Sequence, residues 1–194
     1  MSTVASQLTD NLLNSLYPPS IRALASHHWT PLPVALEASR FLTCAGDAVI
    51  LDIGSGVGKF CLAAAALAPR SLFVGVEQRT SLVAYAETAR KKIGLDNVSF
   101  LHGNFTQLDF RSFDHFYFYN AFYENLAGSD KIDDDIAYSR ELYRYYSHYL
   151  LLQLLQRPAG TRLVTFCSSE DEIPPGYREM DSGFGGQLKF WIKA

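Results

Sequence analysis

VILDIGSGVGKF, residues 49–60, joins an apolar run to three closely spaced glycines. The run Val49–Ile53 predicts a strand covered on both faces, because its hydrophobicity is nearly unbroken rather than alternating. Gly54, Gly56 and Gly58 allow positive φ angles and let the backbone pass close to a ligand. The stretch therefore predicts a strand, a tight turn and a helix start, at the strand end where open α/β sheets bind ligands.

Two phosphate-binding patterns fit this turn poorly. A triphosphate loop needs GxxxxGK followed by Ser or Thr. Here Ile53 stands where the first glycine belongs, Phe60 stands where the hydroxyl belongs, and Asp52 would lie near the anion. A dinucleotide turn needs GxGxxG, and Lys59 occupies the third glycine position. The first reading fails, whereas the second is weakened and leaves a nucleotide-dependent oxidoreductase as an alternative.

Outward from the turn, apolar runs alternate with helical segments. This order predicts an α/β fold, doubly wound, with a mostly parallel seven-stranded sheet and right-handed crossovers. The tail lacks a helix between its two apolar runs, which favours an antiparallel hairpin at the C-terminal edge of the sheet. The expected strands are 49–54, 71–78, 98–104, 114–120, 161–168 and two within 177–194. The expected helices are 7–17, 19–26, 31–42, 58–69, 80–95 and about 135–156.

No linker or repeat interrupts the chain, so residues 1–194 are expected to form one domain. Residues 1–48 would be a helical N-terminal extension and residues 49–194 the core. Hydrophobic residues make up 48% of the chain and charged residues 19%, which is typical of a globular protein. The formal net charge of −3 gives no support for a broad electrostatic grip on nucleic acid, so nucleic acid is an unlikely partner on this criterion.

Other features bear on compartment and metals. The opening MSTVASQLTD lacks the basic start and apolar run of a signal peptide, and CLAAAALA is too short to span a bilayer. The three cysteines lie far apart in apolar surroundings, which predicts reduced, buried thiols and a cytoplasmic location. They are Cys44, Cys61 and Cys167. The histidines show no metal-binding spacing, so no metal site is expected.

DxGxGxG at residues 52–58, on a strand-to-helix turn, resembles the class I (Rossmann-like) S-adenosylmethionine-dependent methyltransferases. The resemblance covers roughly residues 30–166 and implies S-adenosyl-L-methionine as cofactor. The helix behind the turn, with Ser55, would face the carboxylate of the methionine part. Asp52 would face the ammonium group. Glu77 follows the second strand, next to Gln78, and is the residue that the family uses to hold the ribose hydroxyls.

The resemblance also implies cofactor-binding roles for residues after the third expected strand and before the first. Asn104 stands where the family contacts the adenine amino group, and Phe105 either stacks on adenine or packs in the core. Thr30 precedes a proline, as in the non-SET histone-lysine methyltransferases, where this segment helps to cover the cofactor. Thr30 is also expected to cap a helix that begins at Pro31. Trp29 either closes the pocket or anchors that helix.

FYFYNAFYEN, residues 116–125, follows the fourth strand, which in this fold ends beside the transferable methyl group. Asn120 could orient an amine or amide nitrogen there, and Tyr123 could flank it and exclude water. Nitrogen-directed methyltransferases often carry NPPY at this place, whereas this chain keeps the Asn and the final aromatic and lacks both prolines. It is somewhat closer to the non-SET histone-lysine methyltransferases. The alternative is that Asn120 only caps a turn.

Three further groups have competing interpretations. The aspartates at 130, 133, 134 and 135 are expected to complement a helix dipole, or else to form an acidic lip for a cationic substrate. Glu124 could bind a cation, but an ordinary loop glutamate is preferred. The tyrosines expected to form one packed helix face are Tyr138, Tyr145, Tyr146 and Tyr149.

These features together predict an S-adenosylmethionine-dependent methyltransferase that acts on nitrogen, with protein lysine or a small amine as the acceptor. The sulfonium of the cofactor is already activated, so the chemistry needs alignment rather than acid–base groups. A nucleotide-dependent oxidoreductase and a non-catalytic cofactor-binding or interaction module are the alternatives.

Overall fold

The computed structural model describes residues 8–169 and 172–194. Gln7, which begins the first expected helix, lies outside these ranges. So do residues 170 and 171 of the loop after the fifth expected strand, and the first seven residues, on which the signal-peptide argument mostly rests.

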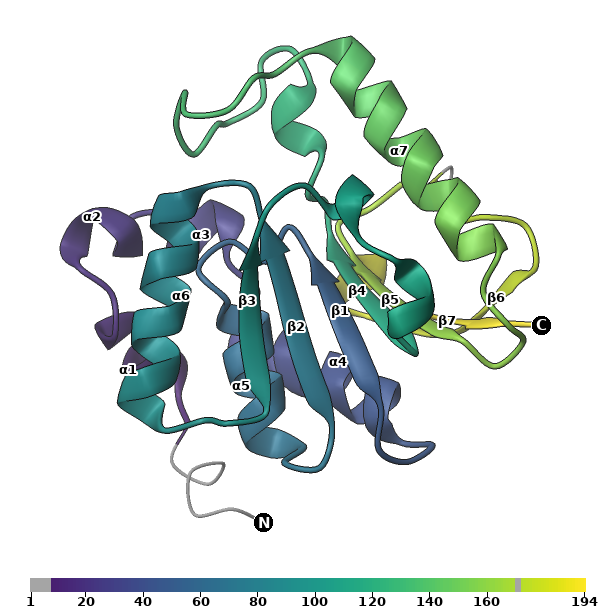
Figure 1. The fold of residues 1–194 in the computed structure, drawn as a ribbon, viewed down its shortest axis with the longest axis horizontal. Helices are drawn as coiled ribbons and strands as arrows, with labels where there is room; N and C mark the ends of the chain where they lie inside the picture. The colour runs from purple at the N-terminus through teal and green to yellow at the C-terminus, as the bar shows by residue number, and fades with distance from the viewer. Residues whose placement is uncertain (1–7, 170–171) are drawn as a thin grey trace.

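Seven strands form one sheet in the order β3-β2-β1-β4-β5-β7-β6 (Figure 1). The five strands on the β3 side pair in parallel, whereas β7 is antiparallel to both β5 and β6. The expected sheet with its antiparallel C-terminal edge is therefore confirmed. The strands are β1 Val49–Ile53, β2 Leu72–Glu77, β3 Val98–His102, β4 His115–Tyr119, β5 Arg162–Phe166, β6 Tyr177–Gly183 and β7 Leu188–Lys193.

Helices cover both faces of the sheet. The α-helices of the described residues are α1 Asp10–Ser15, α2 Pro19–Arg22, α3 Ala25–His28, α4 Leu32–Thr43, α5 Lys59–Leu67, α6 Thr80–Ile93 and α7 Arg140–Leu155. In this part of the chain, none of them is long and apolar enough to cross a membrane. Figure 1 shows the segment between β4 and α7 arching over the carboxyl ends of the central strands.

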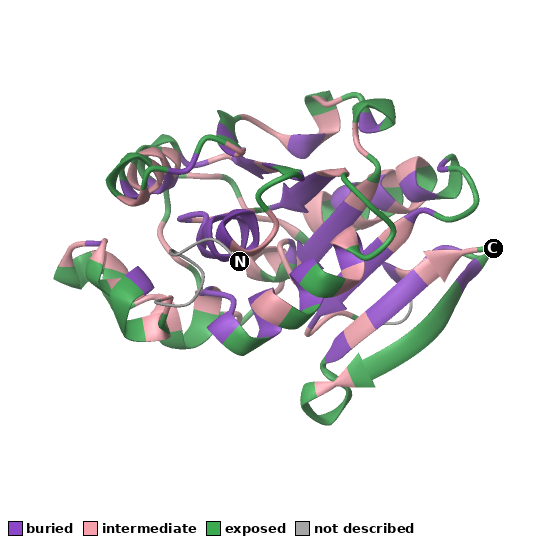
Figure 2. Ribbon diagram, turned by 90° about the horizontal axis from the view of Figure 1, so that it is seen from below, coloured by how far each residue is buried: buried purple, intermediate pink, exposed green. Residues whose placement is uncertain are grey.

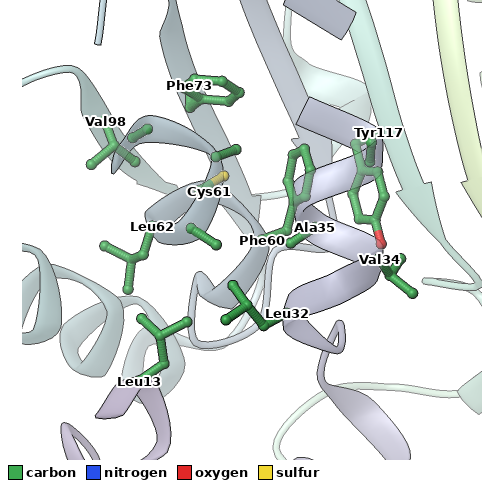
Figure 3. Close-up of a cluster of buried hydrophobic side chains, with 14 of the residues drawn as sticks. Leu13, Leu32, Val34, Ala35, Phe60, Cys61, Leu62, Phe73, Val98 and Tyr117 are labelled. Carbon is green, nitrogen blue, oxygen red and sulfur yellow. The ribbon is translucent and has the colours of Figure 1, made fainter. Parts of the chain in front are cut away.

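Two hydrophobic clusters, one on each face, hold the layers together. Ile50 belongs to the cluster that contains residues of α4, α5 and α6, whereas its neighbour Leu51 belongs to the cluster that contains residues of α7, as expected for a strand buried on both sides. The alanines of α5 allow this helix to lie close to the sheet. In Figure 3, Phe60 of α5 lies beside Tyr117 of β4, and the two rings stack with centroids 3.8 Å apart. At the far edge, β6 is largely exposed (Figure 2).

The last helix starts later than the sequence suggests. Ser139 caps α7, because its Oγ accepts a hydrogen bond from the Leu142 N–H at 3.0 Å. Asp133 and its acidic neighbours therefore precede the helix, and the expected helix-dipole role is wrong for them. The packed tyrosine face is confirmed only in part, because Tyr138 lies before the helix and Tyr145 is 53% exposed.

The start of α4 also differs from the expectation. Pro31 is the N-cap residue, and it makes no side-chain capping bond. The Leu32 N–H donates instead to the Asp10 carboxylate of α1 at 3.2 Å. Thr30 therefore does not cap this helix. Its Oγ1 is hydrogen-bonded to the Tyr117 hydroxyl at 3.0 Å, which ties the N-terminal extension to the centre of the sheet.

The cysteines do not share one environment. Cys61 is buried and Cys167 is half-buried, but Cys44 is exposed at the end of α4. The expectation of three buried thiols is therefore wrong for Cys44. Its sulfur contacts the Arg162 guanidinium, a partner that the apolar neighbours of Cys44 in the sequence do not reveal.

Gly58 decides how closely α5 approaches the sheet. Its φ is +80°, and a Cβ there would come within 2.3 Å of Phe100 Cζ on β3. We expect Gly58→Ala to lower the free energy of unfolding by about 3 kcal/mol, because overpacking and a strained φ add together. Gly94→Ala is the matched control: its φ is +74°, but the added Cβ meets open space. Urea unfolding should show a loss of only about 1 kcal/mol for this control, and equal losses in the two variants would contradict the packing argument.

Candidate functional site

A cavity of about 360 Å³ opens at the carboxyl ends of β1, β2 and β4. Because β1 lies between β2 and β4, this is the point where the strand order reverses, and open α/β sheets bind ligands there. Its walls come from the glycine turn, from the residues after β2, β3 and β4, and from residues 130–138. The expected site residues in these walls are Gly54, Gly56, Glu77, Gln78, Phe105, Asn120 and Tyr123.

The glycine turn is held against β2 and against the segment after β4. The Gly54 and Ser55 N–H groups both donate to the Val76 carbonyl at 3.0 Å. A Cβ at Gly54 would lie 2.4 Å from the Ala121 Cβ. Only two small residues allow this approach, and it brings the turn beside Asn120.

Glu77 joins the turn to the end of β2. Its carboxylate is buried, and it accepts hydrogen bonds from the Gly56 N–H at 3.1 Å and from the Arg79 N–H at 2.9 Å. Burial raises the pKa of Glu77, while the two backbone hydrogen bonds and the Arg79 charge oppose that rise. The carboxylate is thus fixed in the cavity wall by the backbone of the loop that surrounds it.

Arg79 forms a network that the sequence analysis missed. Its guanidinium is 4% exposed, and it contacts Glu124 Oε2 at 2.6 Å, the Tyr138 hydroxyl at 2.6 Å and Asp133 Oδ1 at 2.9 Å. We call Arg79, Glu77, Glu124, Asp133 and Tyr138 the Arg79 clasp. It fixes residues 124–138 over the cavity.

The acidic groups of the clasp raise the pKa of Arg79 and keep its guanidinium charged. Burial alone would lower its pKa, but the hydrogen bond to Asp133 and the charges of Glu124 and Glu77 outweigh burial and raise it. In the sequence, the network is indicated only by Arg79 itself, two residues after Glu77, and by the acidic residues at 130–135 much later in the chain. Nothing local says that these segments meet.

Asn104 and Phe105 differ in their access to the cavity. Asn104 Nδ2 donates to Gln78 Oε1 at 3.0 Å and to the Tyr146 hydroxyl at 2.8 Å, and its Oδ1 accepts from the Thr106 N–H at 3.1 Å. Asn104 is not in the cavity wall, so its contact with adenine stays a prediction. Phe105 does line the cavity and stacks on Phe122 at a centroid distance of 5.1 Å.

A second, smaller cavity of about 30 Å³ lies beside the first and shares Gly54 with it. Thr30, Asp52 and Ser55 contribute to its wall, together with the buried Trp29, which packs edge-on against Tyr17. Ser55 Oγ is buried and makes no hydrogen bond within the described residues. Thus the remaining expected residues gather around a small polar space, and Gly58 and Asn104 line neither cavity.

Asp52 makes the stability of this region depend on pH. Burial raises its pKa to about 7, against an ordinary 3.8, although the Cys61 thiol donates to it at 3.3 Å. At a pH between these two pKa values, the Asp52 carboxyl keeps its proton in the native state but has lost it in the unfolded chain. The free energy of unfolding therefore falls as pH rises through this range. We expect Asp52→Asn to reduce this decline by up to about 1.4 kcal/mol per pH unit. Urea unfolding at pH 5 to 8 would show parallel curves for both proteins if the carboxyl were ionised throughout.

Asn120 follows β4 in a left-handed conformation, with φ +42°. Its backbone carbonyl accepts the Tyr123 N–H at 3.0 Å, so this part of the turn closes through the backbone. Its side-chain amide makes no hydrogen bond to any described residue, and Asn120 lines the cavity. Tyr123 is 45% exposed in the same wall. The geometry therefore gives no support for a turn-capping role of the Asn120 side chain.

Comparison with known proteins identifies the family. Residues 45–184 match the model of a methyltransferase domain family. A tRNA (guanine-N7)-methyltransferase of a Synechococcus species is 49% identical over 59 residues, which are 30% of this chain and 25% of that protein. The corresponding protein of Trichormus variabilis is 34% identical over 84 residues, 43% of this chain and 39% of that protein. The chain thus matches well under two thirds of the length of these relatives.

Solved structures agree in fold. An RNA methyltransferase from Salinibacter ruber, in complex with S-adenosyl-L-homocysteine, superposes with a TM-score of 0.58 at 23% identity over 85% of this chain and 93% of that one. The magnesium protoporphyrin IX methyltransferase of Synechocystis, with bound S-adenosylmethionine, gives 0.59 at 14% identity over 99% and 88%. The chain therefore belongs to the methyltransferase domain family and has the class I fold of S-adenosylmethionine-dependent methyltransferases.

Proposed function

We propose that this protein transfers a methyl group from S-adenosylmethionine to a nitrogen atom of an RNA base. The observation that carries the proposal is a single cavity, at the point of strand reversal, whose walls contain both Glu77 and Asn120. Glu77 would bind the ribose of the cofactor, and Asn120 would orient the acceptor nitrogen. The family match supports this function over an oxidoreductase or a non-catalytic module.

The residues present fit the cofactor. The Glu77 carboxylate would hold the ribose hydroxyls, and Phe105 would pack against the adenine ring. The buried, unpartnered Ser55 Oγ, with Thr30 and Asp52, would receive the polar groups of the methionine part. When bound, S-adenosylmethionine supplies a methyl group on an activated sulfonium centre. The chain itself has to align the acceptor and exclude water.

An RNA base is the acceptor that the comparisons favour. The relatives described above are named as tRNA methyltransferases that act on guanine N7. A ring nitrogen of this kind has a free lone pair at neutral pH, whereas a lysine ammonium must first lose a proton. These similarities argue against protein lysine or a small amine. They also argue against the expectation, drawn from net charge, that nucleic acid is an unlikely partner.

Net charge is a poor guide here because it averages over the chain. Two exposed cations are neighbours of wall residues in the sequence: Lys131 stands between two residues of the wall, and Arg140 follows Tyr138, another wall residue, by two positions. Cations at such positions can contact phosphate groups while the base enters the cavity. Asn120 and Tyr123 would then orient the base and shield it from water.

The proposal is tested with purified protein and S-adenosylmethionine labelled in the methyl group. Unmodified bulk tRNA, a histone mixture and spermidine are offered as separate acceptors, and labelled tRNA is digested to nucleosides and identified by mass spectrometry. We expect label only in a base of the tRNA. Label confined to histone or spermidine would overturn the RNA acceptor, and failure to bind S-adenosylhomocysteine in calorimetry would overturn the cofactor.

A further inference from the structure

Glu124 is bound on only one of its two carboxylate oxygens. Oε2 accepts hydrogen bonds from Arg79 Nη2 at 2.6 Å, from the Tyr138 hydroxyl at 2.9 Å and from the Ile132 N–H at 3.1 Å. Oε1 has no hydrogen-bond partner among the described residues. The side chain is 14% exposed and lines the main cavity, four residues after Asn120.

Oε1 of Glu124 is not among the buried side-chain atoms of the described residues that lack a partner, so it is open to the cavity and to water. A donor group of a ligand in the cavity can replace that water with a direct hydrogen bond to the carboxylate. Arg79 Nη2 and the Ile132 N–H fix the orientation of the group by donating to Oε2. The Tyr138 hydroxyl shares its proton between Oε2 and the Asp133 carbonyl. Oε1 therefore cannot turn toward Arg79 without breaking these bonds. The free oxygen is thus pre-oriented for a hydrogen-bond donor that enters the cavity.

The charge around Glu124 points to the same kind of ligand. Arg79 is shared among Glu124, Asp133 at 2.9 Å and Glu77 at 3.5 Å, so one guanidinium faces three carboxylates. Asp130 adds another carboxylate to the wall. The excess negative charge favours a ligand that offers N–H donors and that gains positive charge as it reacts.

We propose that Oε1 of Glu124 binds the donor edge of a guanine acceptor, and this rests on the function proposed above. Guanine carries N1–H and N2–H donors on one edge and the unprotonated N7 on the other. Glutamate can accept from the first edge while N7 faces the methyl group. Tyr123, half-exposed beside Glu124, offers an aromatic face on which an unstacked base can rest.

The same contact assists the reaction. The lone pair of N7 forms a bond to the methyl carbon while the methyl–sulfur bond breaks, and the electron pair of that bond stays on sulfur. The positive charge thereby passes from sulfur to the guanine ring, and no proton is transferred. A carboxylate on the N1–H edge stabilises that charge as it develops, which links recognition of the base to the rate.

The matched pair Glu124→Gln and Asp133→Asn tests the inference. Both remove a carboxylate charge from Arg79, but only Glu124 lines the cavity. In Glu124→Gln the amide oxygen satisfies Arg79 and Tyr138, which turns the amide NH₂ toward the donor edge of guanine. We expect kcat/KM for unmodified tRNA to fall about 30-fold in Glu124→Gln and less than about threefold in Asp133→Asn. Affinity for S-adenosylhomocysteine should stay within about threefold of wild type in both.

A second comparison identifies the edge that is read. Transcripts in which inosine replaces guanosine lack the N2 amino group. The wild-type protein should methylate them more slowly than normal transcripts. The Glu124→Gln variant should methylate both kinds of transcript at the same rate.

Equal losses in Glu124→Gln and Asp133→Asn would overturn the inference and leave Glu124 as a part of the clasp. Methylation of a base other than guanine would also overturn it while the RNA acceptor stands. If no RNA is methylated, the function proposed above falls first. Should Glu124→Gln fail to fold, Glu124→Asp, which retracts the free oxygen, is expected to show the loss in its place.

Discussion

Replacing Glu77 with alanine is expected to weaken the binding of S-adenosylhomocysteine by about 100-fold, or about 2.7 kcal/mol. The carboxylate is buried at the end of β2, where it can accept from two ribose hydroxyls in a setting of low dielectric. Its loss also leaves the Gly56 and Arg79 N–H groups without their acceptor, so the glycine turn loses a brace at the same time. Calorimetric titration of the variant and the wild type measures the effect directly.

Glu87→Gln is a suitable control for this titration. Glu87 lies on α6, pairs with Arg90 and takes no part in either cavity. Its replacement should leave affinity within about threefold of wild type. A Glu77 variant that is folded, by its thermal transition, and still binds with wild-type affinity would exclude Glu77 as the ribose ligand.

Replacing Asn120 with glycine is expected to lower kcat for methyl transfer about 100-fold, because a misplacement of the reacting groups by about 1 Å can cost that much. Cofactor affinity should change less than about threefold. Glycine is the informative substitution because φ at this position is +42°. It keeps the backbone conformation at no steric cost while removing the side chain that carries the amide. Single-turnover rates with labelled cofactor and saturating tRNA report the chemical step.

Asn120→Ala separates the amide from the backbone. Alanine tolerates a left-handed conformation poorly, so this variant should lose about 1 kcal/mol of stability in addition to activity. Asn120→Gly should lose the activity alone. If the glycine variant retained activity and only the alanine variant lost it, the backbone turn rather than the amide would be what matters at this position.

The sheet could be predicted because each strand carries its own local signal. Val49–Ile53 and His115–Tyr119 are apolar or aromatic runs with clear boundaries, and their order along the chain restricts the topology to a few choices. The part of the cavity wall at the strand ends followed from the same reasoning, since residues just after parallel strands gather at one sheet edge. Gly54, Glu77 and Asn120 each follow or end such a strand.

What the sequence did not reveal depends on contacts between distant segments. Arg79 meets Glu124 and Asp133 across 45 and 54 residues, and no local pattern encodes that pairing. The position of Thr30 before Pro31 predicts a helix cap, but the Asp10 carboxylate, 22 residues before Leu32, accepts the Leu32 N–H instead. In both cases the partner lies far away in the sequence, where local patterns carry no information about it.

The edge strand β6 has a consequence for the protein in concentrated solution. An open sheet edge is a template onto which another chain can add a strand and begin to aggregate. Here Arg178, Glu179 and Asp181 place charges along the exposed strand, and a register shift between Glu179 and Asp181 breaks its regular pairing. These features oppose the addition of a further strand, so the sheet can end at β6 without a covering helix.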